Sequence, residues 1–198
     1  MSDHYFSAEP SSNLRRAPVK ATVWGHDLDL VSASGVFAHG RLDVGTSVLF
    51  RATEPPAGGT LLDLGCGYGA IGCALAVAAP DASVWAVDVN ERALQLTAEN
   101  AQRVGAADRI HISLPAAVPE DLHVDEIWSN PPIRIGKDAL HELLLQWLPR
   151  LRPTGRAVLV VGKNLGADSL QSWLRAEGYG CERLASAKGF RVLEVRPH

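Results

Sequence analysis

The chain has 198 residues, of which 46% are hydrophobic and 21% are charged, as is ordinary for one globular domain with its own apolar core. A formal net charge of −3 excludes a molecule that is basic overall, although it allows a local basic face. The three cysteines are odd in number and form no C-x-x-C pair, so we expect free thiols in a reducing compartment.

An N-terminal extension over residues 1–54 is expected to pack on a core over residues 55–198, the two forming a single domain. The extension begins with a polar arm, residues 1–18, whose aromatic segment His-Tyr-Phe-Ser at 4–7 either folds back near the site or anchors the arm on the surface. Alternating residues then predict a hairpin with strands at 21–24 and 28–31 joined by 25–27, followed by a short helix at 46–53.

The stretch from Thr60 to Ala70 organises the rest of the chain. An apolar run at 60–64 leads into a cluster of glycines, and apolar residues at three-to-four-residue spacing then predict a helix over 70–79. Gly65 and Gly67 tolerate positive φ and let the backbone approach a ligand closely. The helix N-terminus adds free N–H groups and the positive end of a dipole, so this turn can hold the polar part of a nucleotide-like cofactor.

Two cofactors compete for this turn. The spacing Gly65-x-Gly67-x-x-Ala70, with Asp88 ending a predicted strand at 83–87, fits a dinucleotide fingerprint. Asp63, two residues before the first glycine, would lie poorly beside a pyrophosphate because like charges repel, whereas it suits a cationic amino-acid ligand. Asp88 can accept the ribose hydroxyls of either cofactor. A glycine turn that only packs helix on strand is the third reading.

A second turn, Ser-Asn-Pro-Pro-Ile at 129–133, follows a short β-like run at 124–128. Its two prolines remove two backbone donors and leave carbonyls beside the Asn130 amide at a strand end, where ligands bind in open α/β sheets. The Asn130 side-chain oxygen and the Pro131 carbonyl can each accept one hydrogen of a planar NH2 group, which would draw its lone pair toward a methyl donor. A purely structural Pro-Pro turn is the alternative.

Strands and helices are expected to alternate through the core. Two closing strands, at 179–185 and 191–196, are expected to form a terminal hairpin around 187–189. The further predicted elements are strands at 109–113 and 156–161 and helices at 90–104, 137–147 and 168–176.

Together these motifs resemble class I S-adenosylmethionine (SAM) methyltransferases: Asp-Leu-Gly-Cys-Gly at 63–67 looks like their first motif, and Asn-Pro-Pro at 130–132 looks like that of the amino-methyltransferases. The likeness is to the small methyltransferase domain group, which includes the ribosomal RNA guanine-N2 methyltransferases. It extends to residues 4–7 and 35–46, and so covers nearly the whole chain. It departs at Ile133, where many relatives have an aromatic residue that stacks on the target base.

The resemblance implies an α/β doubly wound, mostly parallel seven-stranded sheet whose last strand is antiparallel, unlike a dinucleotide-binding sheet, which normally stays parallel. It also implies SAM as cofactor, guanine N2 of ribosomal RNA as the acceptor, and a ribosomal subunit as partner. The implied catalytic residues are Asn130, Pro131 and Pro132. The implied cofactor contacts are Asp63, Gly65, Cys66, Gly67, Asp88, Ser113 and Asn130, with Ser113 or a backbone group replacing the acidic residue that often binds the adenine amine. The implied substrate contacts include Phe37, Arg41 and Ile133. Arg134 and Lys137 directly follow the Asn-Pro-Pro turn, so they are candidate phosphate-binding cations, and solvated surface charges are the alternative.

Several alternatives stay open. The acceptor can instead be adenine N6, a protein glutamine or a small-molecule amine, and the chain can instead be a non-catalytic SAM-binding module or an NAD-dependent oxidoreductase. No histidine has metal-ligand spacing, so no metal is expected. With no apolar stretch of 18 residues and a polar start, we expect no membrane span, no signal peptide and a cytoplasmic location. The oligomeric state is left undetermined.

Overall fold

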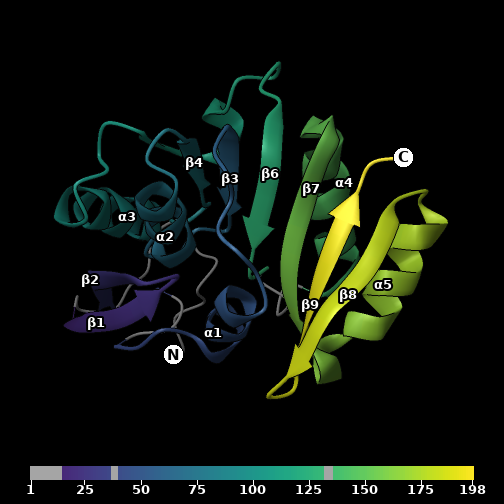
Figure 1. Cartoon of the computed structure of the whole chain (residues 1–198), viewed down its shortest axis with the longest axis horizontal. Coiled ribbons are helices and arrows are strands. Elements are labelled where there is room, and N and C mark those ends of the chain that lie inside the picture. Colours follow the sequence, from purple (N-terminus) through teal and green to yellow (C-terminus); the bar gives the residue numbers. More distant parts are fainter. Residues whose placement is uncertain (1–14, 37–39, 132–135) are drawn as a thin grey trace.

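A seven-stranded sheet forms the centre of the part of the chain that the computed structural model describes, residues 15–36, 40–131 and 136–198 (Figure 1). Its strand order is β5-β4-β3-β6-β7-β9-β8. Neighbours from β5 to β7 pair in parallel, whereas β9 is antiparallel to both β7 and β8. The predicted doubly wound sheet with an antiparallel last strand is therefore confirmed. The strands are β3 (Thr60–Leu64), β4 (Ser83–Val87), β5 (Ile110–Ser113), β6 (Val124–Ser129), β7 (Leu151–Gly162), β8 (Gly180–Ala187) and β9 (Phe190–Arg196).

Helices cover both faces of this sheet (Figure 1). One face carries α1 (Val44–Arg51), α2 (Ala70–Ala78) and α3 (Glu91–Arg103), and the other carries α4 (Lys137–Trp147) and α5 (Ala167–Ala176). Among the described residues, three short 3-10 helices lie in the connections: η1 (Pro115–Ala117), η3 (Leu148–Arg150) and η4 (Lys163–Leu165). None of the helices in the described residues combines the length and apolar character that crossing a membrane requires.

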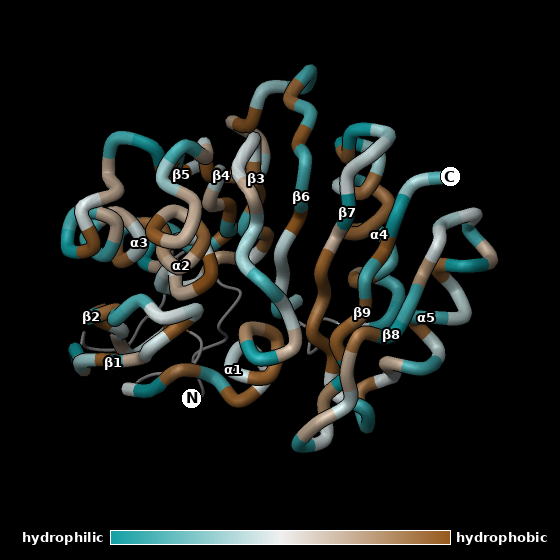
Figure 2. The backbone as a smooth tube through the Cα atoms, in the orientation of Figure 1, coloured by the Kyte–Doolittle hydropathy of each residue, from teal (hydrophilic) through white to brown (hydrophobic). Residues whose placement is uncertain are grey.

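The strands are apolar on both sides because each side faces a layer of helices. Consecutive strand residues point to opposite faces. Leu61 accordingly joins the hydrophobic cluster that contains Leu75 of α2, while Leu62 joins the cluster that contains Leu144 of α4. Figure 2 shows hydrophobic residues along the lower part of β7, between these two layers. This double burial leaves the ends of the strands as the places where polar groups can face a ligand.

The N-terminal hairpin forms a separate two-stranded sheet of β1 (Arg16–Val23) and β2 (His26–Ala33). It is longer than predicted, and its turn is the two residues Trp24 and Gly25 rather than residues 25–27. Both turn residues have positive φ, +48° and +83°, as a type I′ turn requires. Trp24 is held in that conformation because its ring packs edge-on against Phe50 at 5.1 Å and its indole N–H donates to the Thr53 carbonyl at 2.8 Å.

The other predicted elements agree with the structure to within a few residues, with one larger difference at β7. β3, β4 and α4 have the predicted bounds, but β7 begins at Leu151, not at residue 156. Proline and glycine are unfavourable inside a strand, yet Pro153 is exposed and Gly155 allows close strand approach. The pairing of β6 with β7 is irregular here, since Val124 pairs with Leu151 and Glu126 with Arg156. A Cβ on Gly155 would lie 2.7 Å from the Asp125 carbonyl oxygen of β6, so a glycine here allows the close approach at which regular pairing resumes.

Candidate active site

The candidate site lies where the chain changes direction across the sheet. Connections from β3 run outward through β4 to β5, and those from β6 run the other way, so the carboxyl ends of the neighbouring strands β3 and β6 border a crevice. The glycine loop follows β3, Asp88 follows β4 and Asn130 follows β6. The topology therefore brings together three of the predicted segments that are far apart in the sequence.

The glycine loop has a tightly bonded backbone. The N–H groups of Gly65 and Cys66 both donate to the Val87 carbonyl, at 2.8 and 3.0 Å, which ties the loop to the end of β4. Gly69 is the N-cap of α2 with φ +83°, and a Cβ on it would lie 2.8 Å from the Thr97 methyl carbon of α3. Glycine is needed at this position for both reasons, since positive φ strains other residues and the space is already filled.

Asp63 is the most unusual charge in the site. It is fully buried, and its Oδ2 accepts the Gly72 N–H at 2.7 Å. Its Oδ1 has no hydrogen-bond partner in the described part of the chain. The pKa of this carboxyl is raised to about 7, mainly by burial and to a smaller extent by the nearby Asp88 charge, while the Gly72 hydrogen bond lowers it. A buried carboxylate oxygen without a partner is a ready acceptor for a cationic ligand.

Asp88 helps to shape the loop that it borders. Its Oδ2 accepts the Gly67 N–H and its Oδ1 accepts the Asn90 N–H, each at 2.9 Å. Burial raises its pKa, although these backbone hydrogen bonds oppose the rise. Each carboxylate oxygen has more than one lone pair, so Asp88 can still accept hydroxyl groups while it holds the loop.

Two further predicted cofactor residues lie in the same region. The Ser113 hydroxyl at the end of β5 donates to the Leu114 carbonyl at 2.9 Å, so its oxygen remains an acceptor. Cys66 is buried, its sulfur lies 3.5 Å from the Thr97 hydroxyl, and burial raises its pKa well above the ordinary range. A thiol held neutral in this way is a packing group and a poor nucleophile.

Asn130 lies at the end of β6 with its amide nitrogen anchored. Its Nδ2 donates to Asp43 Oδ2 at 2.7 Å and to Thr46 Oγ1 at 3.1 Å. The preceding Ser129 hydroxyl donates to the Leu64 carbonyl at 2.6 Å, which locks the end of β6 to the end of β3. Pro131 is buried directly after this pair of strand ends.

The predicted substrate contacts are only partly covered by the structure. Arg41 and Lys137, the first residue of α4, are exposed. The side chain of Tyr68 donates to the Arg41 carbonyl at 3.3 Å, so the segment before α1 touches the glycine loop. Phe37, Pro132, Ile133 and Arg134 lie outside the described residues.

Sequence reasoning did not assign roles to Asp43, Thr46, Thr97 and Asn100, which support the site. Asp43 and Thr46 hold Asn130, while the Thr97 hydroxyl donates to the Gly67 carbonyl at 3.1 Å. Asn100 is fully buried and donates to the carbonyls of Tyr68 and Val31, at 2.7 and 2.8 Å. The available signal was polar residues on the buried face of a helix, because such residues are placed there only with partners.

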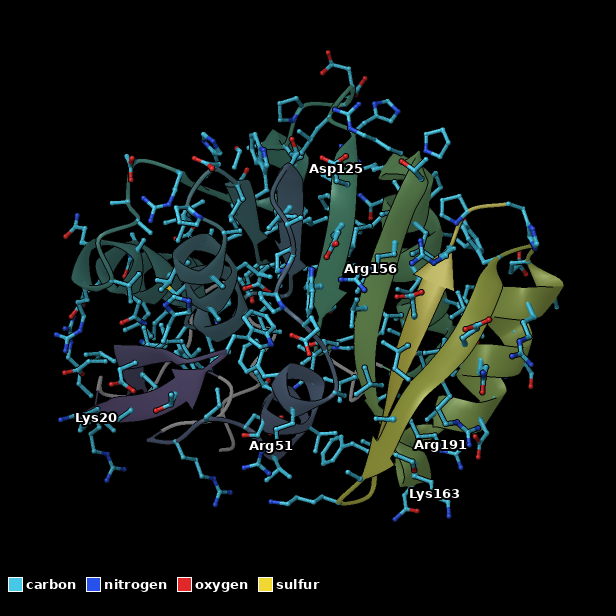
Figure 3. The ribbon with its side chains drawn as sticks, viewed as in Figure 1. Lys20, Arg51, Asp125, Arg156, Lys163 and Arg191 are labelled. Atoms are coloured by element: carbon cyan, nitrogen blue, oxygen red, sulfur yellow. The ribbon has the colours of Figure 1, made fainter. Side chains whose placement is uncertain are left out.

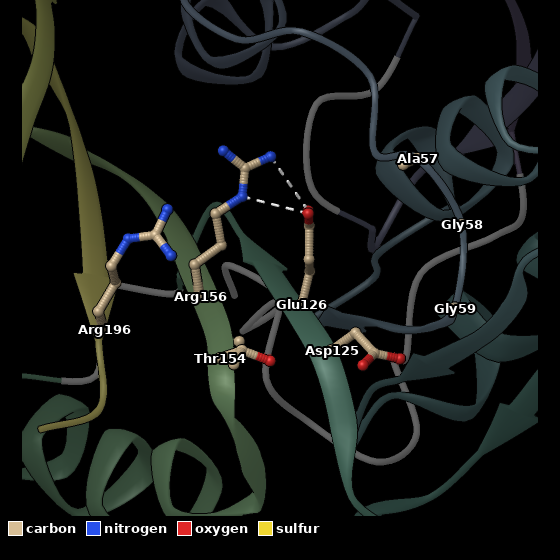
Figure 4. A pocket seen from close by; sticks show the side chains of 9 residues that line it. Ala57, Gly58, Gly59, Asp125, Glu126, Thr154, Arg156 and Arg196 are labelled. Atoms are coloured by element: carbon tan, nitrogen blue, oxygen red, sulfur yellow. Dashed lines mark hydrogen bonds and ion pairs between the residues drawn. The ribbon is translucent and has the colours of Figure 1, made fainter.

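A separate open cavity of about 630 Å³ lies at the other end of the strands, lined by residues that include Gly59, Asp125 and Arg156 (Figure 4). Its charges are already paired, since Arg156 bonds to Glu126 at 3.2 Å and to Glu194 at 3.0 Å. It borders the beginnings of β6 and β7, away from Asn130 and the glycine loop. We therefore assign it no part in the site.

Comparison with known proteins gives a consistent result. The model of the methyltransferase small domain family matches residues 27–194. YbxB, an uncharacterised Bacillus subtilis protein, is 36% identical over 99% of both chains. The ribosomal RNA small subunit methyltransferase C of Ectopseudomonas mendocina is 36% identical over 85% of this chain and 51% of its own.

Solved structures show the same fold. The T. thermophilus 16S rRNA N2 methyltransferase in complex with AdoMet and guanosine superposes with a TM-score of 0.81 at 24% identity, over 96% of this chain and 53% of that one. The ribosomal protein L11 methylase of Lactobacillus delbrueckii superposes with a TM-score of 0.63 at 22% identity, over 80% of this chain and 85% of that one. The chain thus spans about half the length of the ribosomal RNA methyltransferases that it resembles.

Proposed function

Because the chain belongs to the methyltransferase small domain family of SAM-dependent enzymes, we propose that it methylates an exocyclic amine, the N2 of a guanine in small-subunit ribosomal RNA. The family confirms the predicted enzyme class and cofactor. The observation that supports the choice of an amine is Asn130, whose nitrogen is anchored by Asp43 and Thr46, so that the side-chain oxygen is left to accept a hydrogen.

The residues after β3 and β4 fit SAM. The amino-acid part of SAM carries an ammonium, and the buried Asp63 Oδ1 is an acceptor without a partner in the described residues. Gly67 has φ +58°, and a Cβ added to it would meet nothing within 4 Å, so the loop is open at this point to a ligand. Asp88 lies beside Gly67 and can accept ribose hydroxyls. We propose that these three residues hold the cofactor, with Ser113 near the adenine.

Positioning supplies most of the catalysis in this scheme. SAM supplies a methyl group already activated by its sulfonium, so the amine nitrogen bonds to the methyl carbon while the carbon–sulfur bond breaks with its electron pair left on sulfur. Asn130 Oδ1 and the Pro131 carbonyl each accept one hydrogen of the NH2 group and aim its lone pair. The amine nitrogen becomes positive as the bond forms, and it returns to neutrality by releasing one proton to water.

RNA would approach across the carboxyl edge of the sheet. Exposed cations border this edge in the described residues: Arg41 before α1, Arg51 at the end of α1, Lys137 at the start of α4 and Lys163 after β7. Figure 3 shows Arg51 and Lys163 on the lower edge of the molecule, where the parallel strands end. A local basic rim of this kind can bind phosphates although the whole chain has a net charge of −3.

The first test is calorimetric titration with S-adenosylhomocysteine (SAH) and, in parallel, with NADH. We expect micromolar binding of SAH alone. The second test is incubation of tritiated SAM with small ribosomal subunits from cells that lack the gene for this chain, followed by nucleoside analysis. We expect label in N2-methylguanosine. Label in N6-methyladenosine or in protein would overturn the guanine assignment, and binding of NADH alone would overturn the cofactor.

A further inference from the structure

The Asn130 amide has a partner for each of its two hydrogens. Nδ2 donates to Asp43 Oδ2 at 2.7 Å and to Thr46 Oγ1 at 3.1 Å. From this geometry we infer that Asp43 is a positioning residue, which turns the Asn130 amide so that Oδ1 faces the acceptor amine and makes that oxygen a stronger acceptor. The inference rests on the proposed methyl transfer, and it adds to that proposal a residue that does not itself touch the substrate.

The acceptor oxygen of Asp43 decides which way the amide points. An ionised carboxylate has only acceptors, so an amide turned by 180° would place Oδ1 against Asp43 Oδ2 with no hydrogen between them. The Thr46 hydroxyl cannot make this distinction because it donates or accepts equally well. The preference for the productive orientation therefore comes from Asp43, which lies 87 positions before Asn130 in the sequence.

Asp43 is itself held in place, which makes it a rigid support. It is the N-cap of α1, and the same Oδ2 that receives the Asn130 hydrogen also accepts the Thr46 N–H at 3.1 Å. Its carbonyl accepts the Ser47 hydroxyl at 3.0 Å. A Cβ on Gly45 would come within 2.9 Å of both Asp43 Oδ2 and the Phe190 ring, so the space beside the carboxylate is closely filled. Capping α1 and orienting Asn130 are thus done by one oxygen atom.

The contact also changes how strongly Asn130 accepts. A carboxylate that pulls on an amide N–H shifts electron density toward the amide oxygen, because hydrogen bonds in a chain polarise one another. In the proposed reaction the acceptor nitrogen becomes positive, so a more negative Oδ1 stabilises the transition state more than the ground state. Loss of Asp43 should therefore lower kcat and leave KM nearly unchanged.

Three substitutions separate capping from positioning. Asp43→Ser keeps a good N-cap, but the serine side chain is too short to reach Asn130. We therefore expect kcat to fall about 100-fold, while KM and SAH affinity stay within about threefold of the parent values. Asp43→Asn keeps an oxygen for both hydrogen bonds and loses only the charge, so we expect rescue to within about tenfold of the parent. Asp43→Ala loses both functions and should also lower stability. Asp81→Ser, in an exposed turn before β4, is the matched control.

An NMR measurement tests the same contact without any substrate. In the SAH complex, the side-chain NH2 signals of Asn130, assigned by their absence in Asn130→Ala, should exchange at least about tenfold more slowly in the parent than in Asp43→Ser, because hydrogen bonding protects them. Equal exchange in the two proteins, or an unchanged kcat in Asp43→Ser, would overturn the inference. If the parent fails to methylate ribosomal RNA while the exchange difference appears, the proposed substrate is wrong and the orientation of Asn130 by Asp43 stands.

Discussion

Replacing Asp63 by Asn should make the protein more stable at neutral pH and weaken its binding of SAH. Asp63 is fully buried, with Oδ2 accepting the Gly72 N–H and Oδ1 without a partner in the described residues. Asn has the same shape, keeps an oxygen for Gly72 and carries no charge to be buried. Only the cofactor would gain from a negative charge at this place, so stability and function should change in opposite directions.

The pKa of Asp63 sets the size of the stability change. A rise from 3.8 to about 7 corresponds to a preference of about 4 kcal/mol for the neutral carboxyl in the folded protein. The folded state holds this proton more tightly than the unfolded state does. The stability that Asp63 contributes is therefore fully present below pH about 4 and is lost as the pH rises toward 7. Between pH 5 and pH 8 the titration of Asp63 should lower the unfolding free energy of the parent by about 3 kcal/mol, and Asp63→Asn should not show this decrease.

Urea unfolding without cofactor, followed by tryptophan fluorescence at pH 5, 6, 7 and 8, measures this difference. Other titrating groups are common to both proteins and cancel when the two curves are subtracted. Calorimetry with SAH should show affinity lower by about 10- to 100-fold in Asp63→Asn at pH 8, the effect of losing one hydrogen bond to a charged group. A stability difference that is the same at pH 5 and pH 8, or SAH affinity equal to that of the parent, would refute the assignment of Asp63 as a buried acceptor for the cofactor.

Three further substitutions test the rest of the site. Asn130→Ala should keep its SAH affinity, measured by calorimetry, within a few-fold of the parent and lower methyl incorporation by at least about 100-fold. Equal loss of binding and transfer would contradict the role of Asn130. Asn100→Leu should lower the unfolding free energy in urea by about 3 kcal/mol, because buried carbonyls lose their donor, and a change below about 1 kcal/mol would contradict this. Gly69→Ala should lower the unfolding free energy by more than Gly105→Ala does. Both glycines have positive φ, but only a Cβ at position 69 would meet a neighbour, the Thr97 methyl carbon at 2.8 Å. Equal melting temperatures for the two variants would disprove this steric argument.

The sequence predicted the sheet, the glycine turn and the place of Asn130 at the end of β6 because their signals are local. The glycines after β3 and the prolines after β6 constrain their own backbone, and the apolar runs before them have the length of buried strands. The carboxyl ends of parallel strands meet at one edge, so these two turns were expected together. The family resemblance added the antiparallel last strand and the cofactor.

The contacts that support these turns could not be predicted in the same way. The hydrogen bond between Asp43 and Asn130 joins residues 87 positions apart, and nothing near Asn130 in the sequence indicates which acceptor its amide finds. Asn100 lies on the buried face of α3, and its partners belong to a hairpin and a loop that only the tertiary structure brings near. The two-residue turn at Trp24 was missed because a tryptophan with positive φ is uncommon and depends on ring packing with Phe50.

The strand order has a consequence for how the chain emerges during synthesis. β3 is the first strand of the seven-stranded sheet to be synthesised, yet it lies between β4 and β6, and β6 is synthesised only after β5. While residues up to about 113 are outside the ribosome, one edge of β3 has no neighbour, and its Leu61 and Leu62 have only part of their packing. An apolar open strand edge is a template for unwanted pairing. A transcript that ends after β5 would therefore yield an aggregating fragment, and solubility should return only once β6 and β7 are included.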